Sequence, residues 1–412
     1  MAIDIPPIVS VDDHVVEPPD LWQRWLHPKF RAEGPRVVHA SYEMRPGAAR
    51  RFVVQPSGPK ADFWLYEDTA IAIDTASAAS GLPRERKDAR PIAFDEMRPG
   101  CYDRKARLED MDMGHVERSL CFPTYARFCG QTFLEGHDKE LGLACVQAYN
   151  DWMVEEWCGD SGGRLIPLCL VPLWDPDLAA GEVRRNADRG VGAVAFSELP
   201  QFLGLPSLHD SGRYWDPFLA ACEETETVIC MHIGSASRMT TSAEDAPPAA
   251  QAALLTINSQ LCLTDWTLSA SLVRFPRLKL AFSESQIGWM PYILQRLDVM
   301  WERHKGTVLG LDHLLPERPS AYVAGRIYGC VVDDEFGIRS RDSIGIDQIT
   351  FETDYPHTDS TWPDSVEHAS RMLAGLTPEE VKKVVRDNAI RLFRLPEVLA
   401  SSRPRGAEAQ VT

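Results

Sequence analysis

The sequence predicts an α/β fold, a (β/α)8 or TIM barrel with a long insertion after its first strand. Eight short apolar segments recur along the chain, and each is followed by material with helical periodicity. These segments are apolar throughout and do not alternate, which is typical of parallel strands covered on both faces. The alternative is an open doubly wound sheet, which usually begins with a glycine-rich phosphate turn. No such turn follows the first segment, so eight β/α units favour a closed barrel.

The predicted elements follow in chain order. The strands are expected at residues 7–11, 116–122, 165–171, 192–196, 227–232, 278–282, 327–332 and 348–353. The helical patterns cover residues 102–113, 139–157, 177–188, 214–224, 249–275, 289–304, 363–373 and 378–387. We expect residues 1–400 to form a single barrel domain and residues 401–412, which are small and polar, to form a disordered tail.

The long insertion is predicted at residues 28–101. This stretch is rich in Pro, Gly, Ala and Arg and has little clear periodicity. A loop of this length inside a compact domain is usually functional, so we expect it to cover the site or to contact another subunit. Its apolar anchors would be Trp22, Trp25, Phe63, Trp64 and Tyr66.

Composition excludes several classes of partner. The 412 residues include 43 basic and 60 acidic side chains, for a net charge of −17. This charge repels phosphate backbones and anionic membrane surfaces, so we expect no nucleic acid and no membrane partner. The partners we expect are a small-molecule substrate and a second copy of the chain in a homodimer. The ten cysteines include no CxxC pair, and many lie in apolar segments. Reduced buried thiols and the absence of a signal segment predict a cytoplasmic protein.

Polar side chains stand where four of the predicted strands end. Asp12, Asp13 and His14 follow the first strand, His232 the fifth, Glu284 the sixth and Asp354 the eighth, with His357 three residues later. In a barrel these strand ends share one face, and alternation places Asp12 and His14 on the same side. Two imidazoles and two carboxylates can hold a divalent metal and leave a position open for water or substrate. Such ligands suit zinc, our first choice, as well as manganese or iron.

Each of these residues also has a structural interpretation. Asp12, Asp13 or Asp354 could cap a turn, and His232 could be a satisfied core histidine after an apolar strand. Polar groups at four ends of one barrel face jointly favour a site over four separate structural roles.

Five motifs in this order carry a family resemblance. They are VDDHVVEPPDLW at 11–22, MHIGS at 231–235, FPRLKLAFSESQIGWMPYILQRLD at 275–298, FETDYPHTDSTWP at 351–363 and DNAIRLFRL at 387–395. The chain resembles the amidohydrolase superfamily, in the branch of aminocarboxymuconate-semialdehyde decarboxylase. The resemblance implies a (β/α)8 barrel with a divalent metal held by Asp12, His14, His232 and Asp354, of which Asp354 also transfers protons.

The chain departs from that branch at the sixth strand, where its decarboxylases usually have a histidine. Glu284 stands there instead. It could act as an acid or base if burial raises its pKa, or it could bind a second metal. His357 could supply the missing imidazole or only orient Asp354. No lysine ends the fourth strand, in GAVAFSE, so the dinuclear type with a carbamylated lysine is not expected.

These features leave several functions open. The first is a metal-dependent decarboxylase, a carbon–carbon lyase for a small aromatic or unsaturated carboxylic acid, with Asp354 and Glu284 or His357 in proton transfer. The second is a metal-dependent hydrolase of an amide, ester or lactone that uses metal-activated water. The third is a non-haem iron oxygenase, with Asp13, Glu17, Glu284 and His357 available for a second metal. A barrel without metal that serves as a structural partner is the non-enzyme alternative.

Three further residues are candidates for the substrate pocket. Arg127, in the loop after the second strand, could pair with a substrate carboxylate. Trp289 and Trp362 lie just past strand ends six and eight and could line the pocket, or could belong to the core.

Overall fold

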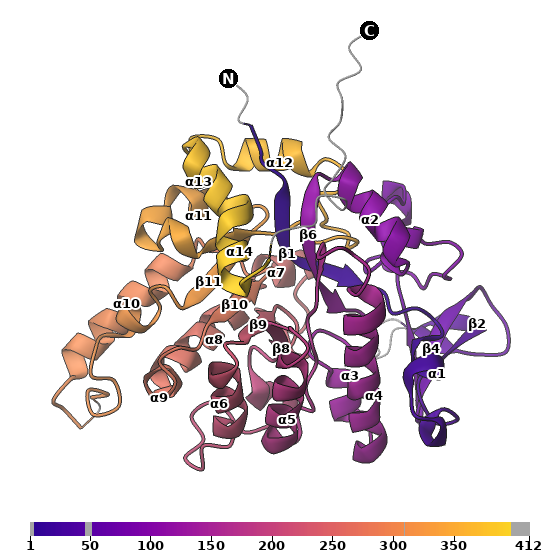
Figure 1. Ribbon diagram of the computed structural model, residues 1–412, viewed down its shortest axis with the longest axis horizontal. Coiled ribbons are helices and arrows are strands. Elements are labelled where there is room, and N and C mark those ends of the chain that lie inside the picture. Colours follow the sequence, from indigo (N-terminus) through magenta and orange to yellow (C-terminus); the bar gives the residue numbers. More distant parts are fainter. Residues whose placement is uncertain (1–3, 46–51, 309, 397–412) are drawn as a thin grey trace, which may run out of the picture.

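The computed structural model describes residues 4–45, 52–308 and 310–396, with helices arranged around a central set of parallel strands (Figure 1). These strands are β1 (Ile8–Val15), β6 (Val116–Pro123), β7 (Leu165–Ile166), β8 (Ala193–Phe196), β9 (Val228–His232), β10 (Leu280–Ser283), β11 (Ile327–Val331) and β12 (Ile349–Phe351). Their order in the sheet is β7-β6-β1-β12-β11-β10-β9-β8. Beyond β7, Cys169 forms a parallel bridge with Val194 of β8. This bridge joins the two ends of the order, so the sheet closes into the predicted (β/α)8 barrel.

The strands are buried along their whole length, as their apolar sequences predict. Every residue of β1, β6 and β9 is buried, including the polar ones. The third predicted strand is shorter than expected, because regular pairing stops at Ile166 and resumes only at the Cys169 bridge. The first is longer than expected and runs through Val15, so Asp12 and His14 lie within β1 and not beyond its end.

Helices connect the strands and pack on the outside of the barrel. They are α1 (Leu21–Trp25), α2 (Arg104–Met113), α3 (Gln131–Glu135), α4 (Lys139–Trp152), α5 (Pro176–Ala187), α6 (Asp216–Glu224), α7 (Pro248–Ala253), α8 (Thr256–Leu268), α9 (Ser271–Arg274), α10 (Met290–His304), α11 (Glu335–Arg339), α12 (Ser365–Met372), α13 (Pro378–Lys382) and α14 (Asn388–Phe393). Asp103, Asp138 and Asp175 cap α2, α4 and α5 through their carboxylates.

Three of the predicted helices are broken or contain π-helical turns in the structure. The pattern at 249–275 forms three helices, because the chain leaves the helical conformation at Leu254 and Ala270, the latter with φ of +58°. The pattern at 378–387 contains a π-helical turn, η9 (Lys383–Asp387), between α13 and α14. A second π-helical turn, η4 (Met153–Trp157), ends the helix that begins at Lys139.

The 28–101 segment is not irregular, contrary to our expectation. It contains a four-stranded antiparallel sheet, β3-β2-β4-β5, made of β2 (Arg36–Met44), β3 (Phe52–Val54), β4 (Lys60–Tyr66) and β5 (Thr69–Ala72). Alternation along β4 sends Trp64 and Tyr66 into the main core and Phe63 into a separate small core with Tyr42 and Ala61.

The same segment contacts the loop that follows β12. The backbone N–H groups of Ala79 and Ser80 donate to Pro356 O, at 2.7 and 3.0 Å, and the N–H of Thr358 donates to Ala76 O at 2.9 Å. The chain between β1 and β6 is therefore bound at the carboxyl-end face of the barrel. The predicted tail at 401–412 lies outside the described residues. Within the described ranges, no helix combines the length and apolar character needed to cross a membrane.

Candidate metal centre

Four predicted ligand side chains converge at the carboxyl ends of the strands. His14 Nε2 lies 3.1 Å from His232 Nε2, and His232 Nε2 lies 3.2 Å from Asp12 Oδ2. His14 Nε2 is 3.6 Å from both Asp12 Oδ1 and Asp354 Oδ1. All four side chains are buried. Asp12 and His14 come from β1, His232 ends β9, and Asp354 follows β12, so barrel closure brings them together.

The two histidines present Nε2 to this centre. His232 Nδ1 lies 2.6 Å from Ile233 O, so Nδ1 carries the proton and Nε2 keeps a free lone pair. The His14 ring has a hydrogen bond with the backbone of Pro123. Phe128 stacks on His232 with 4.3 Å between the ring centroids, and Phe122 contacts His232 edge-on. These contacts fix both rings in an orientation that suits metal binding.

The carboxylates of the centre fit a divalent cation. Both oxygens of Asp12 and Oδ1 of Asp354 are buried and accept no hydrogen bond from any described residue. Burial, and then the nearby Asp354 and Glu284 carboxylates, raise the pKa of Asp12 well above its ordinary value. Buried carboxylates without donors are costly, and a cation relieves both the desolvation and the mutual repulsion. Two imidazole nitrogens and two carboxylates suit zinc, manganese or iron(II).

Glu284 and His357 lie on the solvent side of this group. Glu284 Oε2 is 3.8 Å from His232 Nε2, and His357 Nδ1 is 3.1 Å from Asp354 Oδ1. Their side chains are 23% and 18% exposed, in contrast to the buried ligand set. Burial and the neighbouring Asp354 raise the pKa of Glu284 to about 7, and burial lowers the pKa of His357 to about 4. Near pH 7 a carboxyl with this pKa is about half protonated, so Glu284 can exchange a proton beside a neutral His357 that also faces the centre.

Four buried carboxylates near the centre bind backbone N–H groups or hydroxyls of the strand-end loops. Glu17 accepts from Tyr125 N and Ala126 N, Glu198 from Gly234 N, Glu352 from Glu284 N, and Asp13 from Tyr355 N. Asp13 and Glu17, which the sequence offered for a second metal, thus direct their oxygens to these loops. Sequence reasoning missed Glu198 and Glu352, although each is an acidic residue at the end of an apolar strand.

Three candidates for the substrate pocket have other partners. The Arg127 guanidinium pairs with Glu135 at 2.7 Å and donates to Ser237 Oγ at 2.6 Å, so its charge is already compensated. Trp289 Nε1 donates to Ser285 O, and Trp362 Nε1 donates to Asp110 O. The Trp289 bond lies within the loop after β10, and the Trp362 bond joins the loop after β12 to α2. Arg127 also joins two loops, because Ser237 lies in the loop after β9.

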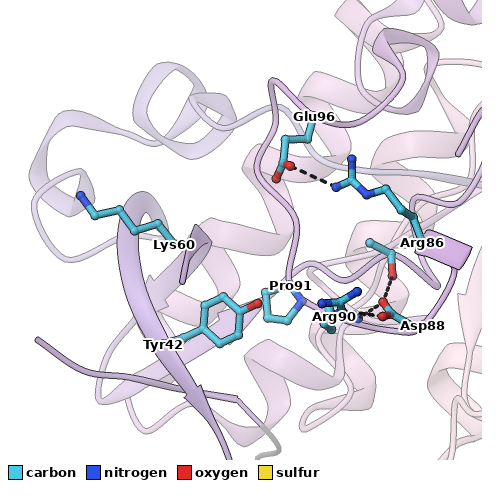
Figure 2. Close-up of a pocket in the computed structure, with 8 residues that line it drawn as sticks. Tyr42, Lys60, Arg86, Asp88, Arg90, Pro91 and Glu96 are labelled. Atoms are coloured by element: carbon cyan, nitrogen blue, oxygen red, sulfur yellow. Dashed lines mark hydrogen bonds and ion pairs between the residues drawn. The ribbon is translucent and has the colours of Figure 1, made fainter. Parts of the chain in front are cut away.

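A polar pocket of about 190 Å³ lies in the 28–101 segment, and Figure 2 shows the residues that line it. None of its lining residues belongs to the metal centre. Its arginines are neutralised in place, because Arg86 pairs with Glu96 at 3.0 Å and Arg90 pairs with Asp88 at 2.5 Å. We therefore assign it no part in the chemistry.

A family model described as amidohydrolase matches residues 34–395. The chain belongs to the amidohydrolase family. The match begins after β1, so Asp12 and His14 lie outside it and their place in the site rests on the geometry above. The resemblance seen in the five sequence motifs is thereby confirmed at the level of the family.

Individual relatives resemble this amidohydrolase at low sequence identity, one by sequence and two by structure. The gamma-resorcylate decarboxylase of Rhizobium radiobacter is 25% identical over 276 residues, which cover 63% of this chain and 78% of that protein. An amidohydrolase from Mycobacterium avium subsp. paratuberculosis K-10 has a TM-score of 0.70 and 21% identity, and the likeness covers 96% of this chain and 99% of that one. The 5-carboxyvanillate decarboxylase of Novosphingobium aromaticivorans DSM 12444 has a TM-score of 0.58 and 18% identity, and the likeness covers 78% of this chain and 89% of that one. Its structure was solved with manganese and 4-hydroxy-3-methoxy-5-nitrobenzoic acid.

Proposed function

We propose that this amidohydrolase is a metal-dependent decarboxylase of a small aromatic or unsaturated carboxylic acid. One observation carries the proposal: Asp12, His14, His232 and Asp354 converge, and three of their buried carboxylate oxygens accept no hydrogen bond from any described residue. These four residues would hold the cation. The gamma-resorcylate decarboxylase and the 5-carboxyvanillate decarboxylase support the choice of an aromatic acid as substrate.

A bound divalent cation supplies local positive charge, which an anionic carboxylic acid needs in a chain of net charge −17. In decarboxylation the carbon–carbon bond breaks, its electron pair stays on the ring carbon, and that carbon takes a proton while carbon dioxide leaves. We assign the proton donor to Glu284, because its side chain is partly exposed and lies beside His232. His357, 3.1 Å from Asp354, would orient that carboxylate.

Zinc and manganese are both proposed as the working ion. The ligand types alone led us to expect zinc. The manganese in the 5-carboxyvanillate decarboxylase supports manganese as an equal candidate beside zinc. Activity of metal-free protein reloaded with either ion separates the two.

The direct test is turnover of hydroxybenzoic acids by metal-loaded protein. Loss of substrate absorbance and release of carbon dioxide should occur with wild type and should vanish in Asp354→Asn. His209→Ala is a matched histidine control, because His209 pairs with Asp265 outside the centre and should leave turnover unchanged. Failure of metal-loaded wild type to decarboxylate any member of a panel of aromatic and unsaturated acids would contradict the proposal.

Hydrolysis of an amide, ester or lactone is the second candidate. Glu284 fits it as well as it fits decarboxylation, because this carboxyl stands where decarboxylases of the resembled branch usually have a histidine. A panel of aryl esters, anilides and lactones, run beside the acids, decides between the two. Iron at about two atoms per chain would instead support the oxygenase alternative.

We further propose that residues 1–400 form one domain and that the 28–101 segment covers the site, since its backbone bonds reach Pro356 and Thr358. All ten cysteines are buried and free, which supports a reducing, cytoplasmic compartment. The homodimer stays a prediction, which light scattering of the purified protein tests.

A further inference from the structure

Asp13 lies between the two ligands of β1, but its carboxylate points away from the metal centre. Its Oδ1 accepts from Thr353 Oγ1 at 2.6 Å and from Tyr355 N at 2.9 Å. Its Oδ2 accepts from Ser119 Oγ of β6. The side chain is 2% exposed. One buried carboxylate is therefore bonded to the residues immediately before and after Asp354.

Asp354 needs such support, because its backbone is in a sparsely populated conformation. Its φ is +50°, the left-handed region that non-glycine residues seldom adopt. The residue also lies beyond the end of β12 at Phe351, outside the regular strand pairing. Residues held in such conformations persist only where the surroundings fix them.

The surroundings of Asp354 tie its turn to β1. The Asp354 N–H donates to Asp12 O at 2.9 Å, and the His14 N–H donates to Tyr355 O at 2.6 Å. The buried Arg107 guanidinium donates to His14 O, and its positive charge stabilises the negative charge of the Asp13 carboxylate. Ser10 Oγ of β1 also accepts from Thr353 N at 2.9 Å, but among the described residues Asp13 is the only one on β1 whose side chain bonds both neighbours of Asp354.

We propose that Asp13 is a positioning residue, which fixes the turn at Thr353–Tyr355 so that the Asp354 carboxylate faces His14. This inference deepens the proposed function, but its first readout does not depend on catalysis. Glu17 offers a matched control, since it is equally buried, follows the same strand and binds Tyr125 N and Ala126 N of a different loop.

Hydrogen exchange of the metal-free protein tests the contact itself. Asp13→Ala should raise amide exchange in a peptide covering residues 352–358 by at least tenfold and leave residues 124–130 protected. Glu17→Ala should do the reverse. Asp13→Asn should stay near wild type, because its amide oxygen still accepts from Tyr355 and its NH2 group can donate to Ser119 Oγ.

The consequence for the site is measured as Mn²⁺ affinity of the same variants. Loss of a group that supports a ligand typically costs 10- to 100-fold in affinity. We expect that loss for Asp13→Ala and less than a threefold change for Asp13→Asn. Glu17→Ala is the control for the exchange experiment only, because its loop carries Phe128, which stacks on His232. With an active substrate in hand, kcat should fall in Asp13→Ala and recover in Asp13→Asn.

Several results would overturn the inference. One is that the amides of residues 352–358 exchange in Asp13→Ala at the wild-type rate. Another is that these amides exchange in a folded Asp13→Asn as fast as in Asp13→Ala. If Asp13→Ala does not fold, Thr353→Val and Ser119→Ala replace it, each removing one hydroxyl from the carboxylate. Faster amide exchange at 352–358 in Thr353→Val but not in Ser119→Ala supports the inference. Equal exchange rates in the two variants reject it. Failure of wild type to bind any divalent cation would instead remove the proposed function and leave the exchange result standing.

Discussion

His14 and His232 place their Nε2 atoms 3.1 Å apart, although 218 residues separate them in the chain. His232 Nδ1 donates a hydrogen bond to Ile233 O, so in the neutral ring the Nε2 atom of His232 offers a lone pair. Burial, and then the proximity of His357 and His232, lower the pKa of His14 well below its ordinary value, which disfavours an imidazolium at this position. Two imidazole Nε2 atoms that face each other beside buried carboxylates form an arrangement that a shared cation stabilises.

Metal content is the first prediction. Protein purified without added metal should contain about one divalent ion per chain, and His232→Ala and Asp354→Ala should each lose most of it, because a missing ligand leaves three donors. Elemental analysis by mass spectrometry measures this, with His209→Ala as the control that keeps its metal. Full metal content in both ligand variants would place the ion elsewhere.

Glu284→Gln should separate catalysis from metal binding. Glutamine keeps the shape of the side chain but cannot deliver a proton, and general acid catalysis typically contributes about 10²- to 10⁴-fold. We expect kcat for a hydroxybenzoic acid to fall within that range while metal content stays at the wild-type level. Glu380→Gln, which alters a carboxylate paired with Arg341 on the surface, serves as the control. A kcat unchanged by Glu284→Gln would move the proton transfer to Asp354 or His357.

Stability should depend on pH through Glu17. Burial raises the pKa of this carboxyl from 4.5 to about 7 in the folded protein. The folded state therefore binds more protons than the unfolded state between pH 4.5 and 7, and stability falls as the pH rises through that window. The Tm advantage of wild type over Glu17→Gln should shrink from pH 4.5 to 7 and stay constant above 8. A constant difference across the whole range would show that Glu17 has an ordinary pKa.

Gly234→Ala should disturb the centre from the loop after β9. Gly234 has φ of +88°, and a Cβ at this position would lie 2.7 Å from Phe128 Cε2. The substitution strains the backbone and pushes the ring that stacks on His232, at a cost of about 1–2 kcal/mol in unfolding free energy. Denaturant unfolding measures the loss. Gly204→Ala has a similar φ of +77° and open space around its Cβ, so it isolates the backbone effect from the contact with Phe128.

The barrel and the convergence of the four candidate ligands could be predicted from sequence, because both follow from local patterns. Apolar runs such as VICMH mark buried strands, and the polar residue that follows each run marks the reactive face. The side-by-side placement of Asp12 and His14 follows from alternation alone.

Other features depend on partners that lie far away in the chain. The sheet of the 28–101 segment escaped prediction because β2, RVVHASYEM, is mostly half-exposed and mixes polar with apolar residues. The different orientations of the Asp12 and Asp13 carboxylates also depend on distant residues, because Thr353 and Ser119 bind the Asp13 carboxylate. The helix break at Ala270 could not be predicted, because neither a glycine nor a proline stands at this position.

The pairing of β1 with β12 has a consequence for the order in which the protein becomes functional. Asp13 and Tyr355 are 342 residues apart, and the centre includes a residue from each of these two regions. Asp12 and His14 are therefore synthesised early and Asp354 near the end of the chain. A chain released before Asp354 is translated would lack one of the four candidate ligands, so the complete set can form only when synthesis is nearly finished.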